Sequence, residues 1–211
     1  MTGQTDNSVH FKTSPGQKSR HAGFALTEFL IAALILFIVA SAVFELLAEI
    51  QRAAGYQAEV QSVLNNTRIA FQTVERIIRQ AGNDPLQSGL CGIVIVSATE
   101  VRIRSDRTGS SGAGKGDPDG DIDDSWEDIT IRHNPASQSL EIVPHGGPAQ
   151  IIANYISDFS MEYYDAQGNP TDSGNEVRRI TVIISGSTLR PDPDTKEPFG
   201  VKLSETIRIR T

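Results

Sequence analysis

The chain has 211 residues, enough for one modest domain and an extension, with the composition of an ordinary folded protein. Its formal net charge of −7 argues against nucleic acid as the main partner, because phosphate binding needs clustered Lys and Arg. Cys91 is the only cysteine, so an intramolecular disulfide is excluded, and we expect its side chain to be a small buried apolar group.

The N-terminal region predicts a membrane anchor. Residues 1–23 are polar and net basic, and residues 24–47 are almost wholly apolar. As a helix, the apolar run would be about 36 Å long at about 1.5 Å per residue, which suffices for a bilayer core about 30 Å thick. Because basic residues precede the run and Glu45 and Glu49 end it, the N-terminus is expected in the cytoplasm and residues 50–211 outside.

A secretory signal peptide is the first alternative to an anchor. Such peptides have a shorter apolar core, and a small-residue cleavage site follows that core. Here the run is too long, and no such site follows Leu47. The small residue Gly23 instead precedes the run, so cleavage there would remove the basic leader and keep the apolar helix.

Glu28 is an acid inside this apolar run. A carboxylate at the centre of a membrane helix costs about 2.5–3.5 kcal/mol, and less near an end, so such a residue usually has a partner. If the chain began at Phe24, its free α-amino group would lie about 6 Å along the helix from Glu28. The amino group of one subunit would then neutralise the carboxylate of a neighbour; the alternative is an acid that simply lies near the lipid headgroups.

Residues 23–32 resemble the class III signal of type IV pilins and of the pseudopilins of type II secretion. That signal is a basic leader, then Gly and Phe, then an apolar helix with an acid at the fifth mature position. The resemblance implies cleavage after Gly23 by prepilin peptidase, N-methylation of Phe24, and a role for Glu28 in subunit registration. Three positions depart from the commoner residues of the family: Ala25, Thr27 and Phe29.

The helical pattern continues beyond the membrane. Apolar or small side chains recur at helical spacing through residues 48–82, with Gln, Arg and Glu between them: Val60, Val63, Leu64, Thr67, Phe71, Val74, Ile78 and Ala81. Residues 82–85 then end the helix with a glycine and a proline. One nearly continuous helix of about 85 Å is therefore expected from residue 24 to 81, with a possible bend at Gly55.

Residues 83–211 predict a globular domain of short strands, because apolar and alternating segments are separated by turn residues. The segments are 92–98, 100–104, 128–133, 139–143, 150–153, 157–164, 176–185 and 201–210. Short connections indicate an antiparallel sheet, and the second half of the helix is expected to cover its apolar face. The expected class is α+β, a pilin-like fold with a long N-terminal helix packed on an antiparallel sheet.

Four stretches narrow the resemblance to PilW-like minor pilins, with the J-type minor pseudopilin as the close alternative. They are the end of the helix at residues 75–82, the segments 119–129 and 156–164, and the C-terminal residues 206–210. The resemblance implies four partners: other pilins or pseudopilins through the helix, prepilin peptidase, an inner-membrane assembly platform, and the lipid bilayer. It also implies a bacterial inner membrane location before filament assembly.

An acidic segment is the one candidate metal site. Asp117, Asp119, Asp121 and Asp123 alternate along the chain and offer the oxygen ligands that calcium prefers. An EF-hand would need glycine where Ile122 stands, so that motif fails. A solvated acidic loop is the alternative, because Asp and Gly are ordinary turn formers, and no cofactor is otherwise expected.

No catalytic motif emerges from the remaining candidates. Residues 109–116 imitate a phosphate-binding loop, but Gly116 replaces the hydroxyl residue that would bind magnesium. His133 and His145 lack triad or metal-ligand spacing, and we expect both in loops. We therefore predict a structural subunit and not an enzyme. The competing classes are a tip-located adhesin or binding module that uses residues 105–127, and a membrane-anchored enzyme.

Overall fold

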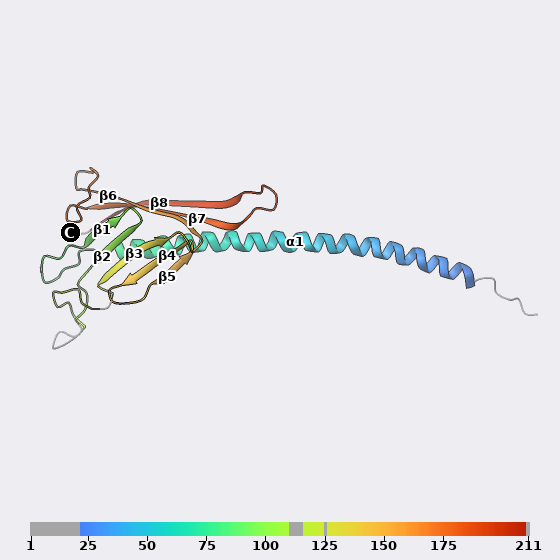
Figure 1. The fold of residues 1–211 in the computed structure, drawn as a ribbon, viewed down its shortest axis with the longest axis horizontal. Coiled ribbons are helices and arrows are strands. Elements are labelled where there is room, and N and C mark those ends of the chain that lie inside the picture. The colour runs from blue at the N-terminus through green and yellow to red at the C-terminus, as the bar shows by residue number, and fades with distance from the viewer. Residues whose placement is uncertain (1–21, 110–115, 125, 210–211) are drawn as a thin grey trace, which may run out of the picture. The chain divides into compact units, whose positions relative to one another are not determined.

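The computed structural model describes the backbone of residues 22–109, 116–124 and 126–209 and, from residue 26 on, their side chains. One long helix, α1 (Ala22–Ile78), is followed by strands β1 to β8 (Figure 1). The chain divides into two compact units, the first ending at Ile50 and the second comprising Gln51–Thr211. The fold is therefore α+β, with a long N-terminal helix and antiparallel sheets, as the sequence predicts.

In the first unit, α1 is apolar and exposed. From Leu26 on, α1 is the one described helix that is long and apolar enough to cross a membrane. Its most apolar 18-residue window has a mean hydropathy of 2.7, and none of that window is buried within the chain. Phe29, Phe37 and Phe44 are each more than 70% exposed. Such a surface needs lipid or other apolar helices around it, because contiguous exposed apolar patches of this size are rare in soluble monomers.

The strands of the second unit form two antiparallel sheets. The five-stranded sheet has the order β1 (Ile93–Ser97), β2 (Glu100–Arg104), β3 (Asp128–Asn134), β4 (Ser139–Pro144) and β5 (Gln150–Asn154). The three-stranded sheet has the order β6 (Ile156–Tyr164), β7 (Arg179–Pro191) and β8 (Pro198–Arg208). Each strand overlaps a predicted segment.

The prediction of a single antiparallel sheet is wrong, because the structure has two sheets. The chain leaves the first sheet at Tyr155. It lies between β5 and β6 with a φ of 64°, a left-handed conformation that turns the chain out of the first sheet. Its carbonyl oxygen accepts a hydrogen bond from the backbone N–H of Ser187 at 3.0 Å, which anchors the turn to β7. The strand that follows therefore pairs with β7 and not with β4.

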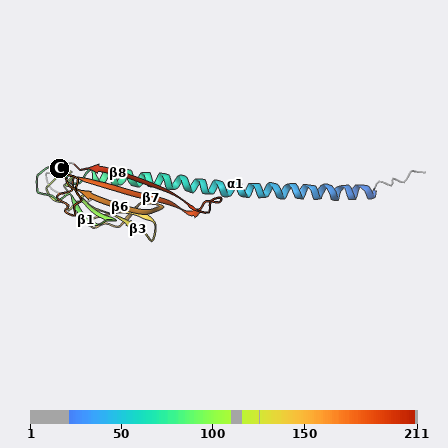
Figure 2. The same cartoon turned by 90° about the horizontal axis from the view of Figure 1, so that it is seen from above.

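The core of the second unit lies between the later part of α1 and the two sheets (Figure 2). The predicted helical stripe is largely confirmed, since five of its members are almost fully buried: Val63, Thr67, Val74, Ile78 and Ala81. Phe159, Ile180 and Ile184 of the smaller sheet and Ile103, Ile131 and Leu140 of the larger one complete the centre of the core. α1 ends at Ile78, three residues before the predicted end at Ala81, and residues 79–82 continue as turns that close at Gly82, which has a left-handed φ of 71°.

Gly186 permits the closest approach of β7 to α1. A Cβ atom at this position would lie 2.2 Å from Thr67 Oγ1 and 3.1 Å from Val63 Cγ1. The Thr67 hydroxyl has little freedom to move, because it donates a hydrogen bond to the Val63 carbonyl at 2.8 Å. The glycine is therefore required by the packing of helix against sheet.

We expect Gly186→Ala to lower the free energy of unfolding by about 1–3 kcal/mol, the usual cost of overpacking a core. Urea denaturation of the full chain in detergent micelles measures this change. Gly200→Ala is the matched control on β8, because its Cβ would meet its nearest neighbour, the Gly186 carbonyl, at an ordinary 3.9 Å. Adding Thr67→Ala to Gly186→Ala should recover part of the loss; equal stabilities for the two glycine variants would contradict the packing argument.

The β7–β8 hairpin ends in an arm, residues 188–199, that is tied to α1. The side chain of Glu59 is 10% exposed and accepts backbone hydrogen bonds from Leu189 at 2.7 Å and Arg190 at 3.2 Å. The Arg190 guanidinium lies 3.7 Å from the same carboxylate. Asp192 of the arm and Tyr56 of the helix line the same surface pocket. These contacts fix the arm along the portion of α1 that belongs to the second unit (Figure 1).

Candidate functional site

The predicted processing residues lie at the beginning of α1. The helix begins at Ala22, so the backbone of Gly23 and Phe24 is helical, and their side chains lie outside the described set. Glu28 follows one turn later and is exposed. The side chains around it at helical spacing, Ile31 among them at 59% exposure, are apolar.

The charge pattern around Glu28 is one-sided. From residue 24 to 51 the chain contains Glu28, Glu45 and Glu49 and no Lys, Arg or His. Among residues 26–109, 116–124 and 126–209, no basic side chain forms an ion pair with Glu28. A carboxylate in an apolar environment is stabilised by a cation, so the arrangement favours a positive partner from outside this part of the chain.

The four predicted calcium ligands are exposed and engage their own loop. The Asp119 carboxylate accepts the backbone N–H of Asp121 at 3.4 Å, and the Asp121 carboxylate accepts that of Asp123 at 3.0 Å. Asp117 is exposed at the beginning of this stretch. No three acidic, His or Cys side chains in the described ranges are arranged to hold a metal ion, so the calcium prediction receives no support from the structure. These turns are typical of a solvated acidic loop.

Two carboxylates whose burial was not predicted from the sequence hold this loop in place. Asp106 is fully buried and accepts backbone N–H groups from Asp119 at 3.3 Å and Gly120 at 3.0 Å. Glu127 is 1% exposed and accepts those of Arg107 at 2.5 Å and Thr108 at 2.7 Å. Both lie in stretches that appear solvent-exposed in the sequence, so only the three-dimensional contacts identify them.

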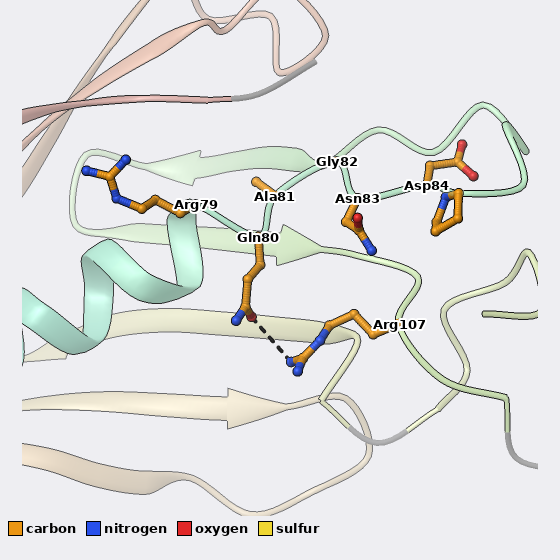
Figure 3. Close-up of a pocket in the computed structure, with 8 residues that line it drawn as sticks. Arg79, Gln80, Ala81, Gly82, Asn83, Asp84 and Arg107 are labelled. Carbon is orange, nitrogen blue, oxygen red and sulfur yellow. Dashed lines mark hydrogen bonds between the residues drawn. The ribbon is translucent and has the colours of Figure 1, made fainter. Parts of the chain in front are cut away.

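A cavity of about 480 Å³ lies where α1 ends (Figure 3). Arg107 reaches into this region and donates a hydrogen bond to the Gln80 side-chain oxygen at 3.3 Å, while Arg79 points away and pairs with Glu75 at 2.6 Å. The Asp84 carboxylate accepts backbone N–H groups from Ser88, Gly89 and Leu90, and these hydrogen bonds, that of Ser88 foremost, lower its pKa. Its charge is therefore used to hold the turn after the helix.

A scan against protein-family models finds no match to this chain, and a search of curated proteins finds none either. The family resemblance therefore stays a resemblance. The proposed function therefore depends on the sequence motif at residues 23–28 and on the geometry of the described residues.

The histidines and the cysteine considered in the sequence lie in strands, turns or loops and have no catalytic arrangement around them among the described residues. His133 lies in strand β3 and not in a loop, and its Nε2 atom is 2.9 Å from the Ile156 carbonyl oxygen. His145 is exposed in the turn after β4, as expected. Cys91 is only partly buried, which corrects the prediction of a buried thiol, and its Sγ donates to the Ile93 carbonyl at 3.1 Å. In the phosphate-loop imitation, residues 110–115 lie outside the described residues.

Asp128 is a buried acid of the second unit that lies within ion-pair distance of two arginines. It is 2% exposed, and the guanidinium of Arg102 donates two hydrogen bonds to its carboxylate. Arg104 Nε lies 3.5 Å from the same carboxylate. The hydrogen bonds that Arg102 donates to Asp128 raise the pKa of Arg102. This cluster links β2 to β3 at the base of the acidic loop, so its role is to position that loop.

Proposed function

We propose that the chain is a structural subunit of a pilus-like filament, most similar to a PilW-like minor pilin and made as a membrane precursor. The observation that carries the proposal is Glu28, an acid four residues after Phe24 in a long exposed apolar helix whose first turn contains Gly23 and Phe24. The α+β fold, in which a long apolar N-terminal helix continues into a domain of antiparallel sheets, is compatible with it.

The proposed mechanism begins with trimming. Prepilin peptidase hydrolyses the bond between Gly23 and Phe24 and frees the Phe24 α-amine close to Glu28; a separate transfer from a methyl donor then methylates that nitrogen. In the membrane, residues 24–47 are surrounded by lipid. During assembly the helices exchange lipid for contacts with one another, and the Phe24 amine of one subunit pairs with Glu28 of the next. The low dielectric of a helical filament interior strengthens that pair and penalises any subunit that is out of register.

The second unit then determines which neighbours fit, because it presents two sheets and their loops outside the membrane. The same helix packing serves a pilus and a type II secretion pseudopilus, so the J-type pseudopilin is a variant of this proposal. The proposed role is structural and not enzymatic. It predicts an inner-membrane, single-pass precursor with a cytoplasmic N-terminus.

Intact-mass spectrometry of the protein purified from its own cells tests the proposal. We expect a polypeptide that begins at Phe24 and carries one methyl group on its terminal nitrogen. Gly23→Glu should retain the full leader, because a bulky charged side chain replaces the small residue before the cut. Gly55→Ala, at a helical glycine with no atom within 4 Å of the added Cβ, is the control and should be processed normally. A mature protein that still carries residues 1–23 would refute the assignment.

A further inference from the structure

Two arginines lie opposite each other on the outer face of the smaller sheet. The register of the β7–β8 ladder pairs Arg179 with Arg208. Their neighbours Ile180 and Ile207 are almost fully buried, and successive side chains of a strand point to opposite faces, so both arginine side chains lie on the face away from the core. Arg179 is half-buried there and Arg208 is exposed.

The backbone brings these two side chains close together. The Ile209 N–H donates to the Arg178 carbonyl at 3.0 Å, which makes these residues a hydrogen-bonded pair at the end of the ladder. Such pairs alternate with non-hydrogen-bonded ones, so the next pair, Arg179 with Arg208, is of the second kind, in which the side chains are closer. Like charges directly opposite each other destabilise a sheet. The arginine pair is therefore stabilised by an anion placed beside it.

The described part of the chain does not neutralise this pair. None of its Asp or Glu side chains forms an ion pair with either arginine. Glu162, in the adjacent row of the sheet, instead accepts a hydrogen bond from the Tyr164 hydroxyl at 2.7 Å. In the same row the hydroxyls of Thr181 and Thr206 are 2.8 Å apart. One of them donates to the other, so the second keeps a hydrogen with which to bind an incoming carboxylate.

The acidic loop has the opposite charge and is likewise unpaired. Residues 116–124 contain five Asp and no Lys, Arg or His. Among the residues that the structure describes, no basic side chain forms an ion pair with any of the five. Four of them are exposed: Asp117, Asp119, Asp121 and Asp123. The loop therefore offers several solvated carboxylates to a positive partner.

Both patches lie at the end of the second unit where α1 ends. A Cβ atom at Gly120 of the acidic loop would lie 3.6 Å from Leu86, in the segment that follows the helix. Arg178 and Ile209, which adjoin the arginine pair, line a cavity of about 210 Å³ together with residues 81–82 at the end of the helix. Copies that stand side by side in one orientation therefore have both patches at the same end.

Subunits that share one orientation contact each other through two different surfaces, which form a heterologous interface. Here the two surfaces carry opposite charges. We propose that the Arg179–Arg208 pair binds the acidic loop, residues 116–124, of a second copy of this chain. The inference rests on the proposed function, in which subunits stand in parallel, and it adds a charged contact outside the membrane.

Zero-length cross-linking tests the contact. Arg208→Lys keeps the positive charge and adds an amine, which a carbodiimide couples only to a carboxylate in direct contact. The unlabelled variant is mixed with isotope-labelled wild-type protein in detergent micelles, and cross-linked peptides are identified by mass spectrometry. We expect the introduced amine to be joined to residues 116–124 of a labelled chain. Lys202, an exposed amine on the same face of β8 and about 20 Å away at about 3.3 Å per residue, is the internal control and should not be joined to that loop.

Charge reversal provides a second readout, the self-association of the full chain measured by sedimentation equilibrium in micelles. Arg179→Glu combined with Arg208→Glu should weaken it at least about tenfold, because like charges then meet. Asp121→Arg combined with Asp123→Arg should have the same effect. An equimolar mixture of these two variants should recover most of the association, since every contact between them again joins opposite charges. Lys202→Glu is the matched control and should change the association less than about twofold.

The inference is overturned if the introduced amine is joined to no loop of another chain, if either charge-reversed variant associates like the wild type, or if the mixture does not recover. Recovery in the mixture also shows that both variants are folded. These results do not depend on how the N-terminus is processed. A native protein that retains residues 1–23 would refute the proposed function and would leave the contact between copies still measurable in micelles.

Discussion

Glu28→Gln is expected to leave the protein in the membrane and to remove it from filaments. Glutamine is close in size, so the apolar helix keeps its length and shape, but the proposed pair with the neighbouring Phe24 amine loses its negative partner. Removing one member of a buried ion pair costs about 3–5 kcal/mol, which corresponds to more than about a hundredfold in the equilibrium of a subunit contact. The measurement is the amount of the protein in filaments sheared from cells, relative to the amount in the membrane fraction.

Glu45→Gln is the matched control for this substitution. Glu45 is an acid of the same helix, near the other end of the apolar run, and it has no place in the proposed pairing. Its variant should assemble at the wild-type level. If Glu28→Gln also assembles at that level, the acid is not used for registration, and the proposed function loses the observation on which it depends.

Asp128→Asn should produce the largest loss of stability in the second unit. The amide has about the same shape as the carboxylate but leaves Arg102 and Arg104 without their shared negative partner. Loss of one partner of a buried ion pair costs about 3–5 kcal/mol, and the partial exposure of both arginines places the expected value near 3 kcal/mol. At about 2–4 °C per kcal/mol for a domain of this size, the melting temperature should fall by roughly 6–12 °C.

Trp126 is the only tryptophan of the chain and lies two residues before Asp128, so its fluorescence reports unfolding at this site. Asp158→Asn is the control, because Asp158 is an exposed acid on strand β6. It should change the free energy of unfolding by less than about 0.5 kcal/mol. An Asp128→Asn variant that unfolds at the same urea concentration as the control would show that the arginine cluster contributes nothing to stability.

The helix was predictable because apolar residues recur at helical spacing over a long stretch, and this spacing depends only on residues close together in the sequence. Apolar periodicity gave a helix from residue 24 to 81, and the structure has one from Ala22 to Ile78. Apolar and alternating segments likewise predicted each strand of the larger sheet to within one residue at either end. These features depend on neighbours in the sequence, so a single chain is sufficient to predict them.

The features that depend on distant contacts were not predictable. β7 was expected to end at residue 185, but it runs to Pro191, because its last residues pair with the beginning of β8 and are held by Glu59, some 130 residues earlier. Nothing in the sequence of the arm alternates clearly enough to predict strands. Asp106 and Glu127 were missed for a similar reason: a buried acid that accepts backbone N–H groups cannot be told from a solvated one without its partners.

The attachment of the arm at Glu59 determines how the second unit would bear mechanical load. β7 and β8 run lengthwise beside the helix, and the hydrogen bonds between them lie across that direction (Figure 1). A pull along the helix axis would therefore reach the β7–β8 hairpin near its tip, through the hydrogen bonds of Leu189 and Arg190 to Glu59, as well as through the apolar core. Without the Glu59 contacts, that force would reach the sheets through the apolar packing between helix and sheets.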